Sequence, residues 1–392
     1  MASKSQPFPV GSAFGFGVYF HWQYCARICP YCDFNVYAAK DRATDDLFEA
    51  CLKDLETQAR ALPEHPPLTS IFFGGGTPSL MQADQIARVI NACDALFGLR
   101  NDCEITLEAN PNNVTPARAQ AWKQAGINRL SIGLQSLDDQ ALSFLGRDHN
   151  SADALNAADI ARDLFASISL DLIYARPGQT LRDWERELTD TLALNAQHFS
   201  LYELTIAPGT AFHKRAERGA LTPLPDELQA QMYELTHTLT QAAGLELYEV
   251  SNHARSARDQ SKHNRLYWRS GDWLGIGPGA HGRLTVDNTR ITTHAHAKPE
   301  AYMKSVRTAG SGLQTRDPLT LEETAQELIT MGLRPVDGIA TARIEALRGA
   351  PITPSKIEHM RDGGWLIRSD ERLALTASGR LLADRIALEL LS

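Results

Sequence analysis

Short apolar runs alternate with longer amphipathic stretches over the first two-thirds of the chain. Six runs rich in β-branched or aromatic residues predict strands, at Gly17–His21, Thr69–Gly74, Cys103–Ala109, Asn128–Gly133, Ser167–Ile173 and His198–Leu204. Apolar residues at helical spacing predict helices between them, at Thr44–Leu62, Ala83–Phe97, Pro116–Ala125, Ser151–Phe165 and Thr180–Asn195. The alternation indicates βα units and a parallel sheet. Six units are too few for a closed eight-stranded barrel, so the pattern alone fits a partial barrel and a doubly wound sheet equally well.

The pattern changes after Pro208, where a helix is predicted at Asp226–Ala243 and a strand at Glu246–Val250. A stretch dense in glycine, histidine and tryptophan follows at 251–296. The last part of the chain predicts helices, a strand pair and a closing helix, at Leu321–Gly332, Thr341–Arg348, Pro354–Asp362, Trp365–Arg368, Arg372–Leu375 and Thr376–Leu391. Helices followed by a short hairpin resemble a winged helix.

These changes of pattern divide the chain into four predicted parts. They are a flexible N-terminal segment at 1–16, an α/β core at 17–250, a connecting region rich in His, Trp and Gly at 251–315, and an α+β winged-helix-like domain at 316–392.

The charge balance bears on partners and location. The chain has 39 Lys and Arg against 47 Asp and Glu, a net charge of −8, which argues against non-specific coating of nucleic acid. The C-terminal part, 316–392, has 10 basic and 12 acidic residues, so we expect no nucleic-acid partner there either. No apolar run reaches the roughly 18 residues of a membrane span. With no secretion or transit pattern at the N-terminus, we expect a cytoplasmic protein.

Six cysteines fall into two groups. Cys51, Cys93 and Cys103 lie on apolar stripes of predicted helices or in a predicted strand, which predicts buried side chains. The other group, Cys25, Cys29 and Cys32, lies within eight residues. Three thiolates at this spacing can converge on one inorganic centre, either zinc or an iron–sulfur cluster. A structural zinc site usually has four ligands in two pairs, and no fourth ligand follows at zinc-finger spacing.

A glycine run and several strand ends carry further candidate residues. Gly74-Gly75-Gly76-Thr77-Pro78 follows the second predicted strand, and its bare backbone suits close contact with a small molecule. It is not a Walker loop, because no Gly-Lys-Ser/Thr follows. Glu108 ends the third strand, Gln135 follows the fourth and Asp171 lies near the end of the fifth. Barrel enzymes place their sites at such strand ends.

The pattern Cys-x3-Cys-x2-Cys, with Tyr31 before the last cysteine, resembles the radical S-adenosylmethionine (SAM) superfamily. The resemblance implies a partial (β/α)6 barrel of TIM type. It also implies a [4Fe-4S] cluster on Cys25, Cys29 and Cys32, whose open iron takes the amino and carboxylate groups of SAM. Reduction then splits the sulfonium and yields a 5′-deoxyadenosyl radical.

Within that superfamily the chain resembles the oxygen-independent coproporphyrinogen III oxidase-like family. The matching segments are Tyr19–His21, Phe73–Ser79, Glu108–Pro111, Ser131–Ser136, Leu145–Arg147 and Asp171–Tyr174. The resemblance implies that SAM contacts Tyr19, Gly75, Gly76, Thr77, Glu108, Gln135, Arg147 and Asp171.

Two features favour the haem chaperone branch of HemW type. The dehydrogenase branch carries a further Cys two residues after the cluster motif, where this chain has Phe34. The segment His263–Trp268 matches His-Asn-x-x-Tyr-Trp. The resemblance implies haem as cargo and delivery to recipient apoproteins. An imidazole can ligate haem iron, which makes His263, with Tyr267 and Trp268, the haem candidate. The histidine that would ligate haem iron is not decided by the sequence, because four more histidines lie in the same region, namely His253, His281, His294 and His296.

Two other functions stay open at this point. One is radical decarboxylation of coproporphyrinogen III in haem biosynthesis, which Phe34 and the His263 motif weaken. The other is a radical enzyme acting on nucleic acid, which the acidic C-terminal part weakens. A haem donor is also expected to make a peripheral contact with the inner face of a membrane, although the sequence offers no anchor. The oligomeric state is left open.

Overall fold

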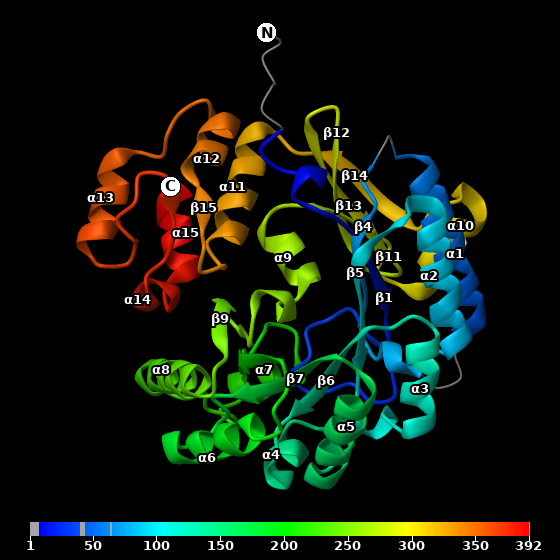
Figure 1. Cartoon of the computed structure of the whole chain (residues 1–392), viewed down its shortest axis with the longest axis horizontal. Coiled ribbons are helices and arrows are strands. Elements are labelled where there is room, and N and C mark those ends of the chain that lie inside the picture. The colour runs from blue at the N-terminus through cyan, green and yellow to red at the C-terminus, as the bar shows by residue number, and fades with distance from the viewer. Residues whose placement is uncertain (1–7, 40–43, 63–64, 392) are drawn as a thin grey trace.

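The computed structural model describes residues 8–39, 44–62 and 65–391, and its centre is a run of six parallel strands (Figure 1). In sheet order these are β1 (Phe16–Trp22), β4 (Leu68–Gly75), β5 (Leu99–Ala109), β6 (Arg129–Gln135), β7 (Ser167–Tyr174) and β8 (His198–Glu203). Each pairs in parallel with the next. The predicted partial (β/α)6 barrel is therefore confirmed, and the doubly wound alternative is excluded.

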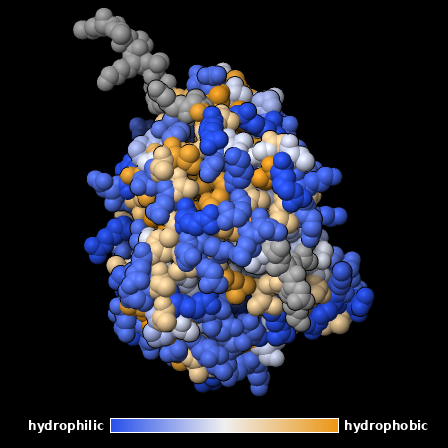
Figure 2. Space-filling view, turned by 90° about the vertical axis from the view of Figure 1, so that its right-hand side faces the viewer, coloured by the Kyte–Doolittle hydropathy of each residue, from blue (hydrophilic) through white to orange (hydrophobic). Residues whose placement is uncertain are grey.

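Helices cover the outside of this sheet. They are α1 (Thr44–Arg60), α2 (Ala83–Phe97), α3 (Pro116–Gln124), α4 (Asp139–Phe144), α5 (Ser151–Leu164) and α6 (Leu181–Leu192). Their apolar stripes pack on strands that are themselves buried on both faces, which explains the nearly continuous apolar runs of the sequence. Cys51 and Cys93 lie in this core, as expected, and Cys103 is buried at its edge. The face over α1, α2 and α10 is mostly hydrophilic, with scattered apolar residues (Figure 2).

The sheet continues beyond the barrel at both ends and reaches twelve strands. After β8 come β10 (Asn252–Ala254) and β9 (Glu246–Glu249), both antiparallel. On the other side β11 (Asp272–Ile276) pairs in parallel with β1. Three antiparallel strands follow, β12 (His281–Val286), β13 (Thr289–Ala295) and β14 (Leu313–Pro318). Residues 251–315, for which the sequence predicted no strands, thus supply most of this extension.

Helix α10 (Pro299–Ala309) returns from this extension to pack on α1. The Tyr302 hydroxyl donates to the buried Asp54 carboxylate at 2.7 Å, and the Gly312 N–H donates to the same carboxylate at 2.9 Å. These bonds fix the extension against the first helix of the barrel.

The C-terminal residues form a unit with its own apolar core. Its helices are α11 (Leu321–Gly332), α12 (Thr341–Arg348), α13 (Pro354–Asp362), α14 (Ala377–Arg380) and α15 (Ala383–Leu391). The first three match the predicted bounds, whereas the predicted closing helix is divided in two. The predicted hairpin is present but short: the Ile367 N–H donates to the Ala374 carbonyl and the Thr376 N–H to the Trp365 carbonyl, at 2.9 Å each, around one bridge between Leu366 and Leu375. In addition, β16 (Arg372–Leu373) pairs with β15 (Ile339–Ala340). The α+β winged-helix-like description holds with this shorter wing.

Residues 8–16, part of the segment predicted to be flexible, contact the C-terminal unit. Val10 is buried in the core of that unit. The Arg343 guanidinium lies 3.8 Å from the centre of the Phe14 ring and donates to the Pro9 carbonyl at 2.7 Å. Residues 1–7 lie outside the described residues, and the four-part division of the chain stays a prediction. No helix within the described ranges is both long enough and apolar enough to cross a membrane.

Candidate functional site

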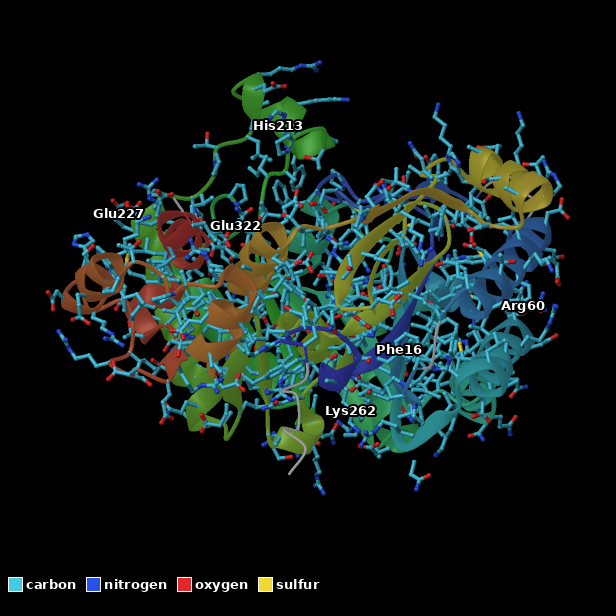
Figure 3. The ribbon with its side chains drawn as sticks, turned by 90° about the horizontal axis from the view of Figure 1, so that it is seen from above. Phe16, Arg60, His213, Glu227, Lys262 and Glu322 are labelled. Carbon is cyan, nitrogen blue, oxygen red and sulfur yellow. The ribbon has the colours of Figure 1, made fainter. Side chains whose placement is uncertain are left out.

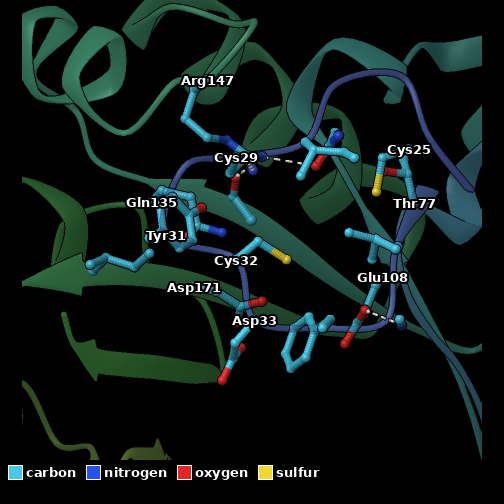
Figure 4. A pocket seen from close by; sticks show the side chains of 18 of the residues that line it. Cys25, Cys29, Tyr31, Cys32, Asp33, Thr77, Glu108, Gln135, Arg147 and Asp171 are labelled. Carbon is cyan, nitrogen blue, oxygen red and sulfur yellow. Dashed lines mark hydrogen bonds between the residues drawn. The ribbon is translucent and has the colours of Figure 1, made fainter. Parts of the chain in front are cut away.

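A cavity of about 370 Å³ opens at the carboxyl ends of the parallel strands (Figure 4). One wall is the loop that carries the three clustered cysteines, and the other walls are the ends of β4, β5, β6, β7 and β8. The residues of the predicted cofactor sites that line it are Cys25, Cys29, Cys32, Gly75, Gly76, Thr77, Glu108, Gln135, Arg147 and Asp171. Parallel strands bring these positions together from distant parts of the sequence.

The cysteine loop is held at its base by two short strands, β2 (Tyr24–Cys25) and β3 (Tyr37–Ala38). Within the loop, the Cys32 N–H donates to the Cys29 carbonyl at 3.1 Å and forms a tight turn. All six cysteines are free thiols. Burial raises the pKa of the Cys25 thiol and raises that of Cys32 to about 11. Such thiols ligate as thiolates only when a metal centre supplies positive charge.

The glycine turn lies directly against this loop. Gly75 has a φ of +107°, and a Cβ there would come within 2.6 Å of the His21 ring. A Cβ on Gly76 would approach the Trp22 carbonyl to 2.8 Å and the Cys25 sulfur to 3.0 Å. Only glycine therefore permits this close approach of the turn to the cysteine loop. Three thiols that line one cavity beside bare backbone fit an iron–sulfur cluster with a small ligand by their chemistry. Among the described residues, however, no three such side chains are already arranged as a metal site.

Two carboxyl groups lie on the cavity floor. Glu108 accepts the Gly75 N–H at 3.2 Å, while Asp171 accepts hydroxyl hydrogens from Ser131 and Ser169 at 2.9 Å each. Burial, and then the charge of Asp171, raise the pKa of Glu108 to about 8. Burial also raises the pKa of Asp171. At neutral pH Glu108 thus holds a proton that a cationic ligand can displace.

Arg147 supplies the cation of the site. Its Nη2 donates to the Asn110 side chain at 2.8 Å and to the Gly133 carbonyl at 3.1 Å, and its Nη1 lies 3.4 Å from the Cys29 sulfur. Gln135 follows a register shift in β6 and has a φ of +64°, a conformation that costs energy for a residue other than glycine. The shift presents its amide to the cavity.

Tyr19 does not line the first cavity, but it shares a second cavity with Glu108 and Asp171, so its contact with SAM stays a prediction. It lies in mid-strand, in register with Phe72 and Gly275, and lines a second, smaller cavity within the barrel. Its hydroxyl is 3.1 Å from the Nδ1 of His21. Strand alternation correctly places the Tyr19 side chain on the inner face of the barrel.

His263 also lies in the second cavity, and both its ring nitrogens are engaged. Nδ1 is 2.9 Å from the Ser70 hydroxyl, and Nε2 is 2.9 Å from the Tyr267 hydroxyl. The ring stacks on Phe72 at 5.0 Å, and burial lowers its pKa to about 3. Trp268 lies apart, beneath the Arg334 guanidinium at 4.8 Å from its ring centre. In this arrangement no nitrogen of His263 is open to an iron.

The other histidines considered from the sequence lie in different places. His253 is buried beside His237, with ring centroids 5.4 Å apart. His281 and His294 pair across β12 and β13 and stack at 4.1 Å, with His281 exposed. His296 is partly buried at the end of that strand pair.

Several lining residues had no role assigned from the sequence. Asn110 holds Arg147, while Ser131, Ser169 and Ser200 cluster about Asp171. Ser169 lies two residues before Asp171, and Ser200 lies two residues before Tyr202, so each pair points to the same inner face of its strand. This period of two is visible in the sequence and could have identified both serines. On the cysteine loop at the cavity, the lining residues Phe34 and Ile28 are exposed although their side chains are apolar.

Comparisons with known proteins agree with this geometry. The profile of the radical SAM superfamily matches residues 19–190, and that of the HemN C-terminal domain matches residues 319–382. The solved structure of coproporphyrinogen III oxidase (HemN) from Escherichia coli covers 98% of this chain and 91% of its own, with a TM-score of 0.81 and 20% identity. At that identity the likeness shows the fold.

Sequence relatives narrow the family. Heme chaperone HemW of Bacillus subtilis is 32% identical over 373 residues, covering 94% of this chain and 97% of the relative. Radical S-adenosyl methionine domain-containing protein 1, mitochondrial, of Danio rerio is 36% identical over 383 residues, covering 94% and 85%. The chain is therefore a radical SAM protein of the HemN-like class. Within that class it belongs to the HemW branch.

Proposed function

We propose that this protein binds haem and delivers it to apoproteins, and that it carries a [4Fe-4S] cluster and SAM in the cavity at the strand ends. The cluster would be held by Cys25, Cys29 and Cys32. When bound, it supplies an electron to the sulfonium of SAM. Relatives of the branch that carry the name heme chaperone support the cargo.

The residues around the cavity would hold SAM through complementary charge. Arg147 would receive its carboxylate, since the guanidinium already lies beside the cysteine loop. Glu108 and the Gly75 turn would receive its amino group. Because burial raises the pKa of Glu108 to about 8, this side chain would release a proton when the ammonium arrives.

The observation that carries haem binding is the apolar mouth of the cavity. Phe34 is 65% exposed, and Ile28 on the same loop is exposed as well. Exposed apolar surface at an opening is typical of a binding site. Haem is flat and apolar with two carboxylates. Arg27 on the cysteine loop, and Lys214 and Arg215 on the projecting helix α7 (Ala211–Glu217), offer cations for those carboxylates (Figure 3).

This placement differs from the one based on His263. For His263 to ligate iron, its bonds to Ser70 and Tyr267 would have to break and a buried ring would have to turn outward. Haem at the mouth needs no such rearrangement. The two placements give opposite expectations for single substitutions.

The test is a haem titration of the anaerobic, cluster-loaded protein, followed by absorption, with transfer to a haem-free globin as the measure of delivery. Phe34→Ser should weaken haem binding about tenfold, the value expected for losing a buried phenyl contact. Leu388→Ser is the matched control, since Leu388 is 64% exposed and lies on α15. His263→Ala should keep the wild-type affinity if it stays folded.

The competing function is decarboxylation of coproporphyrinogen III. The same protein preparation is assayed with that substrate, SAM and a reductant. Repeated formation of protoporphyrinogen IX, or a haem affinity that depends on His263 and not on Phe34, would contradict the proposal as stated.

A further inference from the structure

A group of polar side chains is enclosed where the barrel meets the C-terminal unit. His237 on α8 (Asp226–Ala242) faces His253 on β10, with ring centroids 5.4 Å apart, and Tyr233 lies one turn earlier, 4.7 Å from His237. Arg334, just after α11, and Arg380, at the end of α14, approach from the other side. These five residues are called the junction cluster.

The two sides are joined around this cluster by main-chain contacts. The Val336 N–H donates to the Tyr248 carbonyl at 3.1 Å, and Glu249 forms a β-bridge with Pro335. The Arg334 guanidinium covers the Trp268 ring. Figure 1 shows α8 and β9 beneath α14, which agrees with these contacts. The cluster is therefore walled by residues of both units.

Several polar atoms of the cluster have no hydrogen-bond partner among the residues that the structure describes. His253 is 2% exposed, and neither of its nitrogens is bonded. The Nε2 of His237 and the Nε of both Arg334 and Arg380 are likewise buried without a partner, as is the Nε1 of neighbouring Trp268. Buried polar groups are nearly always satisfied in native proteins. Their concentration at one place indicates a partner outside the chain.

The unpaired groups define the chemistry of that partner. The guanidinium Nε–H groups and the indole N–H are donors, and each neutral imidazole has one donor and one acceptor nitrogen. The Tyr233 hydroxyl and the Oδ1 of Asn252 are also buried without a partner, so a few acceptors accompany the donors. Two guanidinium groups give the site a positive potential, and burial, and then the charge of Arg380, lower the pKa of His237 to about 4. The nearby Glu249 accepts a bond from Asn252, and burial raises its pKa to about 7. A metal cation would meet two guanidinium charges, whereas an anion would meet their attraction.

We propose that the junction cluster binds a small oxyanion, a phosphate or a carboxylate group, which bridges the barrel and the C-terminal unit. Its oxygens accept from Arg334, Arg380 and the imidazole of His253. Charge-assisted bonds from two guanidinium groups suit both groups. Because one ligand contacts both units, its binding strengthens their contact. This site shares no residue with the proposed haem surface and does not depend on it.

The test is thermal unfolding of the full-length protein with inorganic phosphate, with acetate, and with chloride at equal ionic strength. A ligand that binds only the folded protein raises its melting temperature by mass action. We expect a saturable rise of at least about 2 °C with phosphate or acetate over chloride. The arm that saturates at lower concentration identifies the preferred group. Equal responses to all three salts would overturn the proposal.

Two variants locate the effect. Arg380→Gln and His253→Phe should each weaken the anion response about tenfold. Arg385→Gln should leave the response unchanged, since Arg385 is largely exposed on α15 and pairs with Glu389 of the same helix. Should Arg380→Gln and His253→Phe both respond like the wild type, the site is not at the junction.

Discussion

Two polar regions lie in one barrel, and they differ in how their side chains are satisfied. Around the second cavity, Ser70 and Tyr267 each form a hydrogen bond with His263, and the ring of His263 is enclosed by aromatic neighbours. Around the cavity at the strand ends, three thiols and a protonated Glu108 face an opening. The first arrangement uses its polar groups to hold the fold together, and the second keeps them for ligands. A motif alone does not distinguish these two uses.

The largest expected effect is loss of the cluster. Cys25→Ala, Cys29→Ala or Cys32→Ala should each abolish the brown chromophore after anaerobic reconstitution, because two remaining thiolates hold a four-iron cluster poorly. Absorption near 400 nm and iron content are the measurements. Cys51→Ala is the control, since Cys51 is buried in the core. Equal loss of the chromophore in Cys51→Ala would contradict the assignment of Cys51 to the core.

The next effect tests the closed region. His263→Ala should lower the free energy of unfolding by about 2–4 kcal/mol, since it empties a packed site and leaves two hydroxyls unpaired. His281→Ala, at an exposed position, should change it by less than about 0.5 kcal/mol. Tyr267→Phe alone should cost about 1 kcal/mol, and less when added to His263→Ala. Urea unfolding measures all four variants. Additive costs would show that the two side chains are not coupled.

The last effect tests the open region through its dependence on pH. The pKa of Glu108 is about 8 when folded and near its usual value of 4.5 when unfolded. A raised carboxyl pKa stabilises the fold most below pH 4.5, and that contribution is lost as the pH rises to 8. Without SAM, the wild type should therefore lose up to about 1.4 kcal/mol of unfolding free energy per pH unit relative to Glu108→Gln over this range. Unfolding measured between pH 5 and 8 should show the two stabilities diverging; parallel curves would contradict a raised pKa.

Local patterns predicted most of the barrel because its strands and helices follow one another along the chain. The helices Ala83–Phe97 and Pro354–Asp362 were predicted to the residue. The pairing of β11 with β1 was missed because the two strands lie about 250 positions apart, which no local periodicity reveals. The hairpin of β12 and β13 was missed although its two-residue turn, Asp287-Asn288, is a local signal. In the C-terminal unit the pairing of Arg372 with the distant Ala340 was likewise not visible in the local pattern.

In the candidate site, too, local features could be predicted and contacts between distant residues could not. The cysteine motif and the glycine turn could be recognised in the sequence because their residue types and spacing are distinctive. At the turn, only glycine fits so close to the cysteine loop. The second cavity that Tyr19 lines could not be foreseen, because alternation gives the face of a strand but not the depth along it. The engagement of both nitrogens of His263 depends on Ser70, nearly 200 residues away, and could be known only from the fold.

The parallel pairing of β1 with both β4 and β11 has a consequence for synthesis of the chain. β1 leaves the ribosome among the first residues, yet the strand that covers one of its edges ends at Ile276. At the usual rate of about 5–20 residues per second, that edge waits roughly 12–50 s for its partner. An uncovered strand edge invites pairing with other chains. The nascent protein therefore passes through a period in which the cysteine loop is already complete while the sheet beside it is still open.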